Sequence, residues 1–579
     1  MSGFNGFRPT LLTNIRLQKS VFSFIHLRPT DLPQTQSISE NHSSSSTPLN
    51  ETNNPIMIHD SNITIQDDDI QIEHERKIQM ITDMLHKEGE EDAVKGLAMI
   101  DAIQRLGIEY RFQDEIRAIL LRHYTTPTNH DQNDLHEVAL RFRLLRQEGY
   151  YVPTGVFDKF QEEGKFNEKL SCDIKGLMGL YEASQLGRED EYLLDEAGEY
   201  SYGLLNSLMV TNNLDRNQAK AVENLLKHPY YKSLPNFMAR NSLISCFKLQ
   251  EGNQWINDLQ EVADFEFQIV QLQHQEEKAQ VSEWWKDVGL SKELKFARDQ
   301  PLKWFMWSIT ALTDPSLSQQ RVELVKPISL VYILDDIFDV HGTLQDLTFF
   351  TSVVDRWDIA SIEKLPDYMK ICFQAIDKIT NEVSNKVYEQ HGWNPVVSLR
   401  KSWGSLCNAF LVEARWFSTS NLPRAEEYLE NGIVSTGVHV VLVHLFFLVG
   451  EGINKENVEL IEGNPGIMRS TSKILRLWDD FGSAKDENQE GNDGSYVECY
   501  MKEHQESSGE NATKHVLQMI SDTWKQLNHE CLFHNPFSPT LTKACLNVAR
   551  MVPSMYSYDE NCSLPLLEEV MNSFVHQKV

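Results

Sequence analysis

The spacing of apolar residues is the feature that most constrains how this chain can fold. From about residue 66 onward, apolar residues recur every three or four positions, as in segments 98–107 and 139–146. The alternation of apolar and polar residues that marks β-strands is nearly absent. Glycine and proline residues at 149–153 and 227–235 separate segments of ordinary helix length. The sequence therefore predicts an all-α protein.

The length of the chain predicts more than one domain. Its 579 residues are enough for two or more separate hydrophobic cores. A polar stretch near 250–265 is the expected boundary between them. We therefore expect two helical domains of similar size, an N-terminal domain at 56–262 and a C-terminal domain at 263–579.

The N-terminal 55 residues differ in composition from the rest of the chain. The first thirty contain four basic residues and no acidic residue, and a serine run follows at 43–46. This composition is typical of an organelle transit peptide, although disordered tails of cytosolic proteins also lack acidic residues. We expect residues 1–55 to be a leader that directs the protein to the plastid, with the mitochondrion and the cytoplasm as alternatives.

Charge and hydropathy exclude several kinds of partner. The net charge of −30 and the pI near 5.1 disfavour nucleic acid and anionic membrane surfaces, which attract basic proteins. The longest apolar stretch, at 440–450, contains His444 and is too short to span a bilayer. The eight cysteines show neither C-x-x-C pairs nor zinc spacing, so we interpret them as reduced, mostly structural thiols. An anionic substrate would need bridging cations.

An apolar segment at 328–334 ends in three carboxylates. In a helix, Asp335 and Asp339 would lie one turn apart on one face, with Asp336 beside them. The preceding apolar residues would hold this helix in a core and leave the carboxylates at its rim. Oxygen ligands of this kind suit Mg²⁺ or Mn²⁺, and Mg²⁺ often completes its shell with substrate phosphate. A solvated acidic helix end would give the same pattern, so other motifs must decide.

A second acidic helix face is predicted at 476–487. Asp479, Ser483 and Glu487 fall at i, i+4 and i+8, and Arg476 precedes them by one turn. Two acidic faces with arginines suit a metal-bridged diphosphate, because cations neutralise the phosphates and arginine donates paired hydrogen bonds to the remaining oxygens. The spacing therefore favours diphosphate chemistry over two solvated helix faces.

Aromatic residues follow an arginine in the segment 294–307. Arg298 precedes four large aromatic or sulfur-containing side chains at 304–307, which end in Trp307. Aromatic faces stabilise cations where water is absent. Such a run is usually a core stripe, but the two acidic motifs favour a cavity wall.

Six segments of the sequence occur together in one known family and in the same order. They are 101–107, 140–147, 296–298, 335–339, 476–480 and 498–503. In these segments the chain closely resembles plant terpene synthases, over essentially the whole length after the leader. The resemblance implies a catalytically silent N-terminal helical domain and a C-terminal class I catalytic domain that holds three Mg²⁺ ions, with Mn²⁺ as an alternative.

The resemblance also implies roles for individual residues. The metal ligands would be Asp335, Asp336, Asp339, Asp479, Ser483 and Glu487, of which Asp335 and Asp339 would bind metal directly. The substrate contacts would include Arg298, Arg476, Asp335, Asp339, Asp479 and Tyr556. The catalytic side chains would be those of Arg298, Arg476 and Trp307, with Trp307 facing the carbocation. Residues 435–437 match a helix break whose carbonyls point into the cavity.

The sequence departs from the family pattern in places that concern the product. The usual Arg-x-Arg reads Arg298-Asp299-Gln300, so one cation is missing. The N-terminal arginine pair followed by tryptophan is absent, since the first tryptophan is Trp255. That pair accompanies isomerisation before ring closure in cyclic monoterpene synthases. The chain therefore resembles the subfamily that makes acyclic alcohols, including linalool and nerolidol synthases.

Two further departures limit the chemistry. The family's Gly-Asp-Gly-Tyr type of loop is replaced at 558–562, so we assign no acid or base there. The absence of Asp-x-Asp-Asp argues against class II chemistry started by protonation.

The combined expectation is a monomeric enzyme that ionises an allylic prenyl diphosphate and captures the cation with water at C3. The product would be linalool from geranyl diphosphate, favoured in a plastid, or nerolidol from farnesyl diphosphate, favoured in the cytosol. The alternatives are a cyclic mono- or sesquiterpene synthase and a non-enzymatic helical scaffold with acidic caps. A chain-elongating prenyl transferase is disfavoured, because it would carry a second aspartate-rich motif at 479–487.

Overall fold

A computed structural model describes most of the chain. The described residues are 61–126, 134–211, 213–234, 254–419, 422–483, 495–505, 508–532, 535–557, 567–568 and 570–571. The predicted leader at 1–55 lies outside them. Within them, the two short strands β1 (Gln161–Glu162) and β2 (Lys165–Phe166) form one antiparallel hairpin, and nearly all other regular structure is helical. The prediction of an all-α protein is confirmed.

The helices of the N-terminal half pack around their own core. They are α1 (Ser61–Glu91), α2 (Ala93–Arg105), η2 (Glu109–Arg111), α3 (Gln113–Thr125), α4 (Leu135–Gln147), η3 (Thr154–Phe160), η4 (Glu168–Cys172), α5 (Ile174–Ser184), α6 (Tyr192–Val210), α7 (Arg216–Lys227) and η5 (Tyr230–Lys232). Aspartates start several of them: Asp92, Asp134 and Asp173 accept hydrogen bonds from backbone N–H groups of the first turn. Buried aliphatic and aromatic side chains of α1 to α6 form the main core, α5, α6 and α7 share a smaller cluster, and Tyr231 of η5 belongs to the core of the other half.

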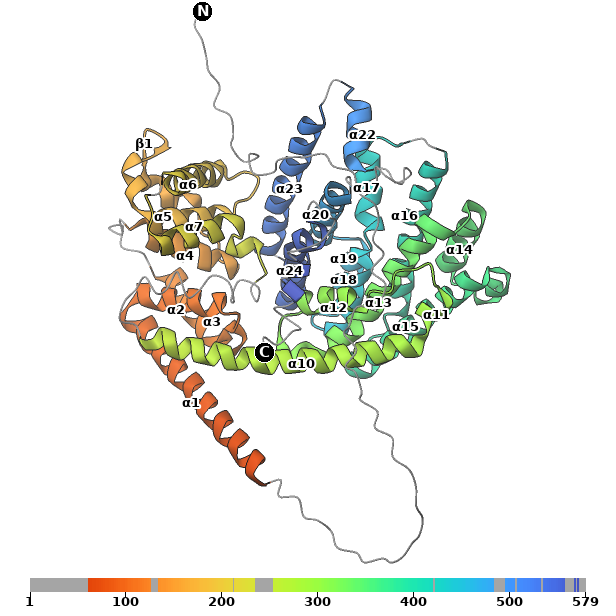
Figure 1. The fold of residues 1–579 in the computed structure, drawn as a ribbon, viewed down its shortest axis with the longest axis horizontal. Helices are drawn as coiled ribbons and strands as arrows, with labels where there is room; N and C mark the ends of the chain where they lie inside the picture. The colour runs from red at the N-terminus through yellow and green to blue at the C-terminus, as the bar shows by residue number, and fades with distance from the viewer. Residues whose placement is uncertain are drawn as a thin grey trace, which may run out of the picture.

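The C-terminal half has the larger core. Its elements are α10 (Gln254–Val288), α11 (Leu290–Glu293), α12 (Pro301–Ala311), η6 (Pro315–Leu317), α13 (Ser318–Asp336), η7 (Ile337–His341), α14 (Leu344–Arg356), η8 (Ile359–Lys364), α15 (Asp367–His391), α16 (Val396–Ser418), α17 (Ala425–Ser435), α18 (Val438–Val449), α19 (Lys455–Glu462), α20 (Gly466–Ser483), α22 (Tyr496–Glu503), α23 (Gly509–Leu532) and α24 (Pro539–Tyr556). Helices α12, α13, α18, α20 and α24 contact one another in that order, and α24 contacts α12 again. These contacts close a ring, whose helices lie near the centre of the molecule in Figure 1.

Helix α10 connects the two halves. It runs beneath both of them in Figure 1. Its first turns contribute Trp255, Leu259 and Val262 to the N-terminal core, whereas Val281 and Trp285 belong to the C-terminal core. The boundary predicted at residue 262 falls inside this helix. The division into 56–262 and 263–579 stays a prediction.

One apolar segment, Ala425–Val449, has the length and hydropathy of a membrane span. It consists of two helices, α17 and α18, of 11 and 12 residues, and each is too short to cross a bilayer. In addition, 78% of its apolar window is buried inside the fold. The segment is therefore part of the core.

The break between α17 and α18 requires glycine. Gly437 has φ 69°, in the left-handed region, and a Cβ there would lie 2.3 Å from Cγ1 of Val331 on α13. This close approach brings residues 435–436 to the wall of the central ring.

Candidate active site

A cavity of about 450 Å³ is lined by residues of the ring helices together with residues of α16, α17 and η7. Along α13, the cavity wall changes from apolar residues at Ile328 and Val331 to acidic residues at the C-terminal end. Along α20, it changes in the same way from Leu475 to Asp479. The cavity therefore has a charged portion and an apolar portion, as a site for a ligand with a charged head and a hydrocarbon tail would need.

The three aspartates of the first motif line the cavity together. Asp335 and Asp336 end α13, and Asp339 lies in η7, a π-helical segment. The regular helix expected through residue 339 is thus replaced by a wider turn, in which the N–H of Gly342 donates to the carbonyl of Ile337 at 2.8 Å. Such turns occur frequently at functional sites.

Asp336 is engaged with Arg298. The backbone N–H of Arg298 donates to Oδ2 of Asp336 at 2.7 Å, and the Nε of Arg298 lies 2.7 Å from Oδ1. Another guanidinium nitrogen contacts the carboxylate of Asp335, and the guanidinium group lies over the ring of Tyr332, 4.9 Å from its centroid. Burial raises the pKa of Asp336, and Arg298 opposes this shift. Asp336 therefore fixes the position of Arg298 at the cavity.

Arg476 and Asp479 line the cavity from α20. The guanidinium of Arg476 lies 3.3 Å from Asp479 and 3.4 Å from Asp480, and it donates to the hydroxyl of Tyr428 at 3.2 Å. This arrangement brings together Arg476 and Asp479 as the sequence predicted. The side chain of Ser483, at the end of α20, and all of Glu487 lie outside the described residues.

Asp480 is a functional candidate that the sequence reasoning missed. It is 4% exposed and accepts hydrogen bonds from the hydroxyl of Tyr428 at 3.1 Å and from the backbone N–H of Tyr496 at 2.9 Å. Burial raises its pKa to about 7, although Arg476 opposes the shift. Asp480 thus joins α17, α20 and α22 behind Arg476. A second acidic residue directly after Asp479 was the available signal.

Lys303 and Tyr332 lie on the cavity wall near the acidic groups. Burial and the nearby charge of Arg298 lower the pKa of Lys303 to about 8, whereas Asp479 opposes the shift. Burial raises the pKa of Tyr332 to about 12, with Asp479 and Asp335 both contributing. Both side chains line the cavity. Carboxylates of both acidic groups therefore influence the same part of the cavity.

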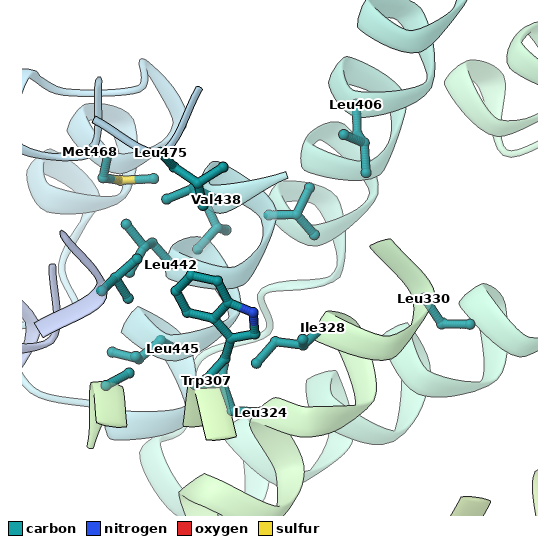
Figure 2. Close-up of a cluster of buried hydrophobic side chains, with 14 of the residues drawn as sticks. Trp307, Leu324, Ile328, Leu330, Leu406, Val438, Leu442, Leu445, Met468 and Leu475 are labelled. Carbon is teal, nitrogen blue, oxygen red and sulfur yellow. The ribbon is translucent and has the colours of Figure 1, made fainter. Parts of the chain in front are cut away.

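The apolar portion of the cavity surrounds Trp307. Figure 2 shows the indole of Trp307 among the aliphatic side chains of Ile328, Val438, Leu442 and Leu445. Its Nε1 donates to the hydroxyl of Tyr332 at 2.9 Å. The indole is thus held at the wall by a specific hydrogen bond.

Only part of the predicted aromatic wall faces the cavity. Among the described residues at 304–307, Trp307 is the cavity-lining one, whereas Trp304, Phe305 and Met306 are fully buried in the core. Four consecutive residues of a helix point in four directions, so they cannot share one face. Tyr556, at the end of α24, lines the cavity as expected.

Comparison with known proteins agrees with this geometry. The family described as "Terpene synthase family, metal binding domain" matches residues 286–526, and "Terpene synthase, N-terminal domain" matches residues 49–226. The chain belongs to the terpene synthase family. This terpene synthase is 59% identical to "Probable terpene synthase 13" of Ricinus communis, over 89% of this chain and 90% of that protein.

Two further relatives have named products. This terpene synthase is 51% identical to an (E)-nerolidol synthase of Cannabis sativa, over 83% of this chain and 88% of that protein. It is 48% identical to the chloroplastic S-(+)-linalool synthase of Arabidopsis thaliana, over 85% of this chain and 86% of that protein. The resemblance to plant terpene synthases of the linalool and nerolidol type is confirmed.

A solved structure shares the whole architecture. Isoprene synthase from grey poplar leaves (Populus x canescens), solved in complex with three Mg²⁺ ions and dimethylallyl-S-thiolodiphosphate, superimposes with a TM-score of 0.81 at 33% identity. The match covers 87% of this chain and 97% of that one. Together with the matched metal-binding domain, it makes this terpene synthase a metal-dependent lyase.

Proposed function

We propose that this terpene synthase ionises an allylic prenyl diphosphate and captures the cation with water as an acyclic tertiary alcohol. The products are linalool from geranyl diphosphate and nerolidol from farnesyl diphosphate. The observation that carries the proposal is the single cavity lined by two acidic groups, on α13 with η7 and on α20, and by an apolar portion around Trp307.

The acidic groups fit divalent metal ions. Asp335 and Asp339 on one wall and Asp479 on the other offer the hard oxygen donors that Mg²⁺ and Mn²⁺ prefer. Ser483 and Glu487, which the sequence predicts as further ligands, complete the proposed second group. A divalent ion held by these carboxylates would neutralise charge on the diphosphate and so make it a better leaving group. We assign Asp336 to the positioning of Arg298, because its carboxylate already contacts that residue through both oxygens.

The basic residues hold the diphosphate. Arg298 and Arg476 line the cavity beside the acidic groups and offer several N–H donors to phosphate oxygens. Lys303 adds a third cation at the same wall. Because these groups are fixed before the substrate binds, they stabilise the charge that develops on the departing diphosphate with little rearrangement.

The apolar portion holds the hydrocarbon chain. The face of Trp307 stabilises positive charge, and its aliphatic neighbours keep bulk water away from the cation. The absence of the N-terminal arginine pair and the replacement of a cation by Gln300 favour an acyclic product. The nerolidol and linalool synthases among the relatives support the same product class.

The test is product analysis with both substrates. The purified full chain and a variant lacking residues 1–50 are incubated with geranyl or farnesyl diphosphate and Mg²⁺, and the products are separated by chiral gas chromatography. We expect linalool and nerolidol to dominate and EDTA to abolish diphosphate release. A majority of cyclic products would refute the acyclic assignment, and metal-independent diphosphate release would refute the mechanism.

We also propose that the leader directs the enzyme to the plastid. The composition of residues 1–55 and the chloroplastic linalool synthase among the relatives support this compartment. A fluorescent fusion of the full chain should enter plastids, and a fusion without residues 1–50 should not. A full-length fusion that stays in the cytosol would contradict the proposal and favour nerolidol as the product.

A further inference from the structure

One buried carboxylate on the cavity wall has no role in the proposed binding of metal ions and diphosphate. Glu413 lies on α16, is 7% exposed and lines the cavity. Of the acidic residues that line the cavity in the described part of the chain, the others belong to the two acidic groups at 335–339 and 479. Glu413 is therefore the one carboxylate available for another task.

The hydrogen bonds of Glu413 orient its carboxylate. The hydroxyl of Ser435 donates to Oε1 at 2.6 Å, and the side-chain amide of Asn431 donates to the same oxygen at 3.2 Å. Across the described residues, no donor reaches Oε2. Since Glu413 lines the cavity and Oε1 already accepts two hydrogen bonds, Oε2 is the oxygen with more acceptor capacity left for a molecule in the cavity.

The surroundings of Glu413 make it a stronger base than an exposed carboxylate. Burial raises its pKa, and Asp335 adds to this effect. Arg476 and the hydrogen bonds from Ser435 and Asn431 act in the opposite direction and favour the ionised form. An ionised carboxylate with a raised pKa is suited to accept a proton near neutral pH.

Three hydroxyl groups on the same wall already form hydrogen bonds within the protein. Tyr428 donates to Asp480, and the hydroxyl of Tyr332 accepts from Trp307. The hydroxyl of Thr436 donates to the carbonyl of Ile433 at 3.2 Å. Each of these side chains is also a much weaker base than a carboxylate.

We propose that Oε2 of Glu413 binds the water molecule that captures the allylic cation and accepts its proton. This inference rests on the proposed function. The water oxygen forms the new C–O bond at C3 with its lone pair, and one of its O–H bonds breaks. The proton moves to Oε2, and the electron pair of that bond stays on the alcohol oxygen. Glu413 returns the proton to bulk water when the product leaves.

The decisive variant is Glu413→Gln. Its amide oxygen still accepts from Ser435, but the side chain accepts no proton from water. The ratio of tertiary alcohol to acyclic olefin should fall by about tenfold or more, whereas diphosphate release should fall by less than about threefold, because only the step after ionisation loses its base. Products are measured by gas chromatography and diphosphate by a coupled assay.

Two variants complete the design. Glu462→Gln is the matched control, because Oε1 of Glu462 accepts from the hydroxyl of Ser398 at 2.7 Å outside the cavity, and it should leave the ratio unchanged. Glu413→Asp retains an acid and should keep more of the alcohol than Glu413→Gln. If Glu413→Gln does not fold, Glu413→Asp provides the test. Its ratio of alcohol to olefin should then be lower than that of Glu462→Gln, and an equal ratio would overturn the role of Glu413.

The outcomes separate this inference from the proposed function. A wild-type enzyme that makes the tertiary alcohol, with an unchanged ratio in Glu413→Gln, overturns the role of Glu413 alone. A large loss of diphosphate release at an unchanged ratio also overturns it and assigns Glu413 to ionisation. A wild-type enzyme that makes no tertiary alcohol overturns both.

Discussion

Neighbouring carboxylates in this cavity differ in what they contact. Asp335 and Asp336 are adjacent in sequence and both meet Arg298. Asp336 is almost enclosed and binds the backbone of Arg298 as well as its side chain, whereas the side chain of Asp335 is 33% exposed. Asp335 is thus accessible to a ligand in the cavity, and Asp336 holds the arginine beside it.

Replacing Asp335 with alanine tests the metal assignment. We expect turnover to fall by about 100-fold or more, because the variant lacks one donor to the ions that stabilise the departing diphosphate. The fold should remain intact, since this partly exposed side chain fills no core space. Diphosphate release at saturating Mg²⁺ and a thermal melt give the two readouts. Near-normal turnover would exclude Asp335 as a ligand.

Asp480 should make stability depend on pH. Its pKa in the folded protein is raised to about 7, so ionisation of this buried group costs stability. The protonated carboxyl contributes its full stabilisation below the pKa of the unfolded state. This contribution to the free energy of unfolding is lost as pH rises from about 4 to about 7. The free energy of unfolding of the wild type should therefore fall, over this range, relative to that of Asp480→Asn. Chemical denaturation in EDTA measures the difference, and a pH-independent difference would contradict the raised pKa.

At the scale of elements, the cavity depends on two interruptions of helices. The π-helical η7 follows α13 and carries Asp339, and the break at Gly437 separates α17 from α18. A continuous α17–α18 helix would require a different backbone at residues 435–437. The two interruptions add Asp339 and residues 435–436 to the polar groups that the regular helices already place at the cavity wall.

Gly437→Ala should destabilise the protein more than the same change at another left-handed glycine. Gly392 has φ 71° and no atom within 4 Å of an added Cβ, so Gly392→Ala should cost about 1 kcal/mol of unfolding free energy. At Gly437 the added Cβ also meets Val331, and the cost should be about 2–5 kcal/mol. Denaturant unfolding compares the two variants. Equal losses of unfolding free energy would show that Val331 moves away from the added Cβ at little cost.

At the scale of the whole molecule, the N-terminal half supports helices that form the cavity. Asn528 on α23 donates to the carbonyl of Gln185 at 3.0 Å and to that of Gly187 at 2.9 Å. Arg550 on α24 donates to the carbonyl of Tyr231 at 2.6 Å. These contacts join α23 to the segment after α5, and α24, a member of the ring, to η5.

Asn528→Ala should weaken this junction. Asn528 is 1% exposed, and its loss leaves two carbonyls without their donor, so we expect a destabilisation of about 1–3 kcal/mol. Gln526→Ala on the same helix is the control, because Gln526 donates to Glu189 at the surface and should change stability by less than about 0.5 kcal/mol. Denaturant unfolding and limited proteolysis measure both. Equal effects would mean that the junction contributes little to stability.

The sequence by itself determined the helical class, the two acidic motifs and the family. These properties depend on periodicity and on spacings of a few residues, which a helix converts directly into shared faces. Arg476 and Asp479, one turn apart on α20, both line the cavity, as their spacing indicated. Asp335 and Asp339 also line it, although a π-helical turn carries Asp339 where a regular helix was expected. Periodicity alone did not single out Trp307, which lines the cavity, from residues 304–306, which are buried in the core.

Only the tertiary structure decided which neighbours each of these residues has. The pairing of Asp336 with Arg298, the burial of Asp480 and the position of Glu413 depend on contacts between segments tens of residues apart. Helix α10 likewise crosses the expected boundary because it packs against two cores at once. Burial and charge at a site arise from such distant contacts, and no spacing along the chain records them.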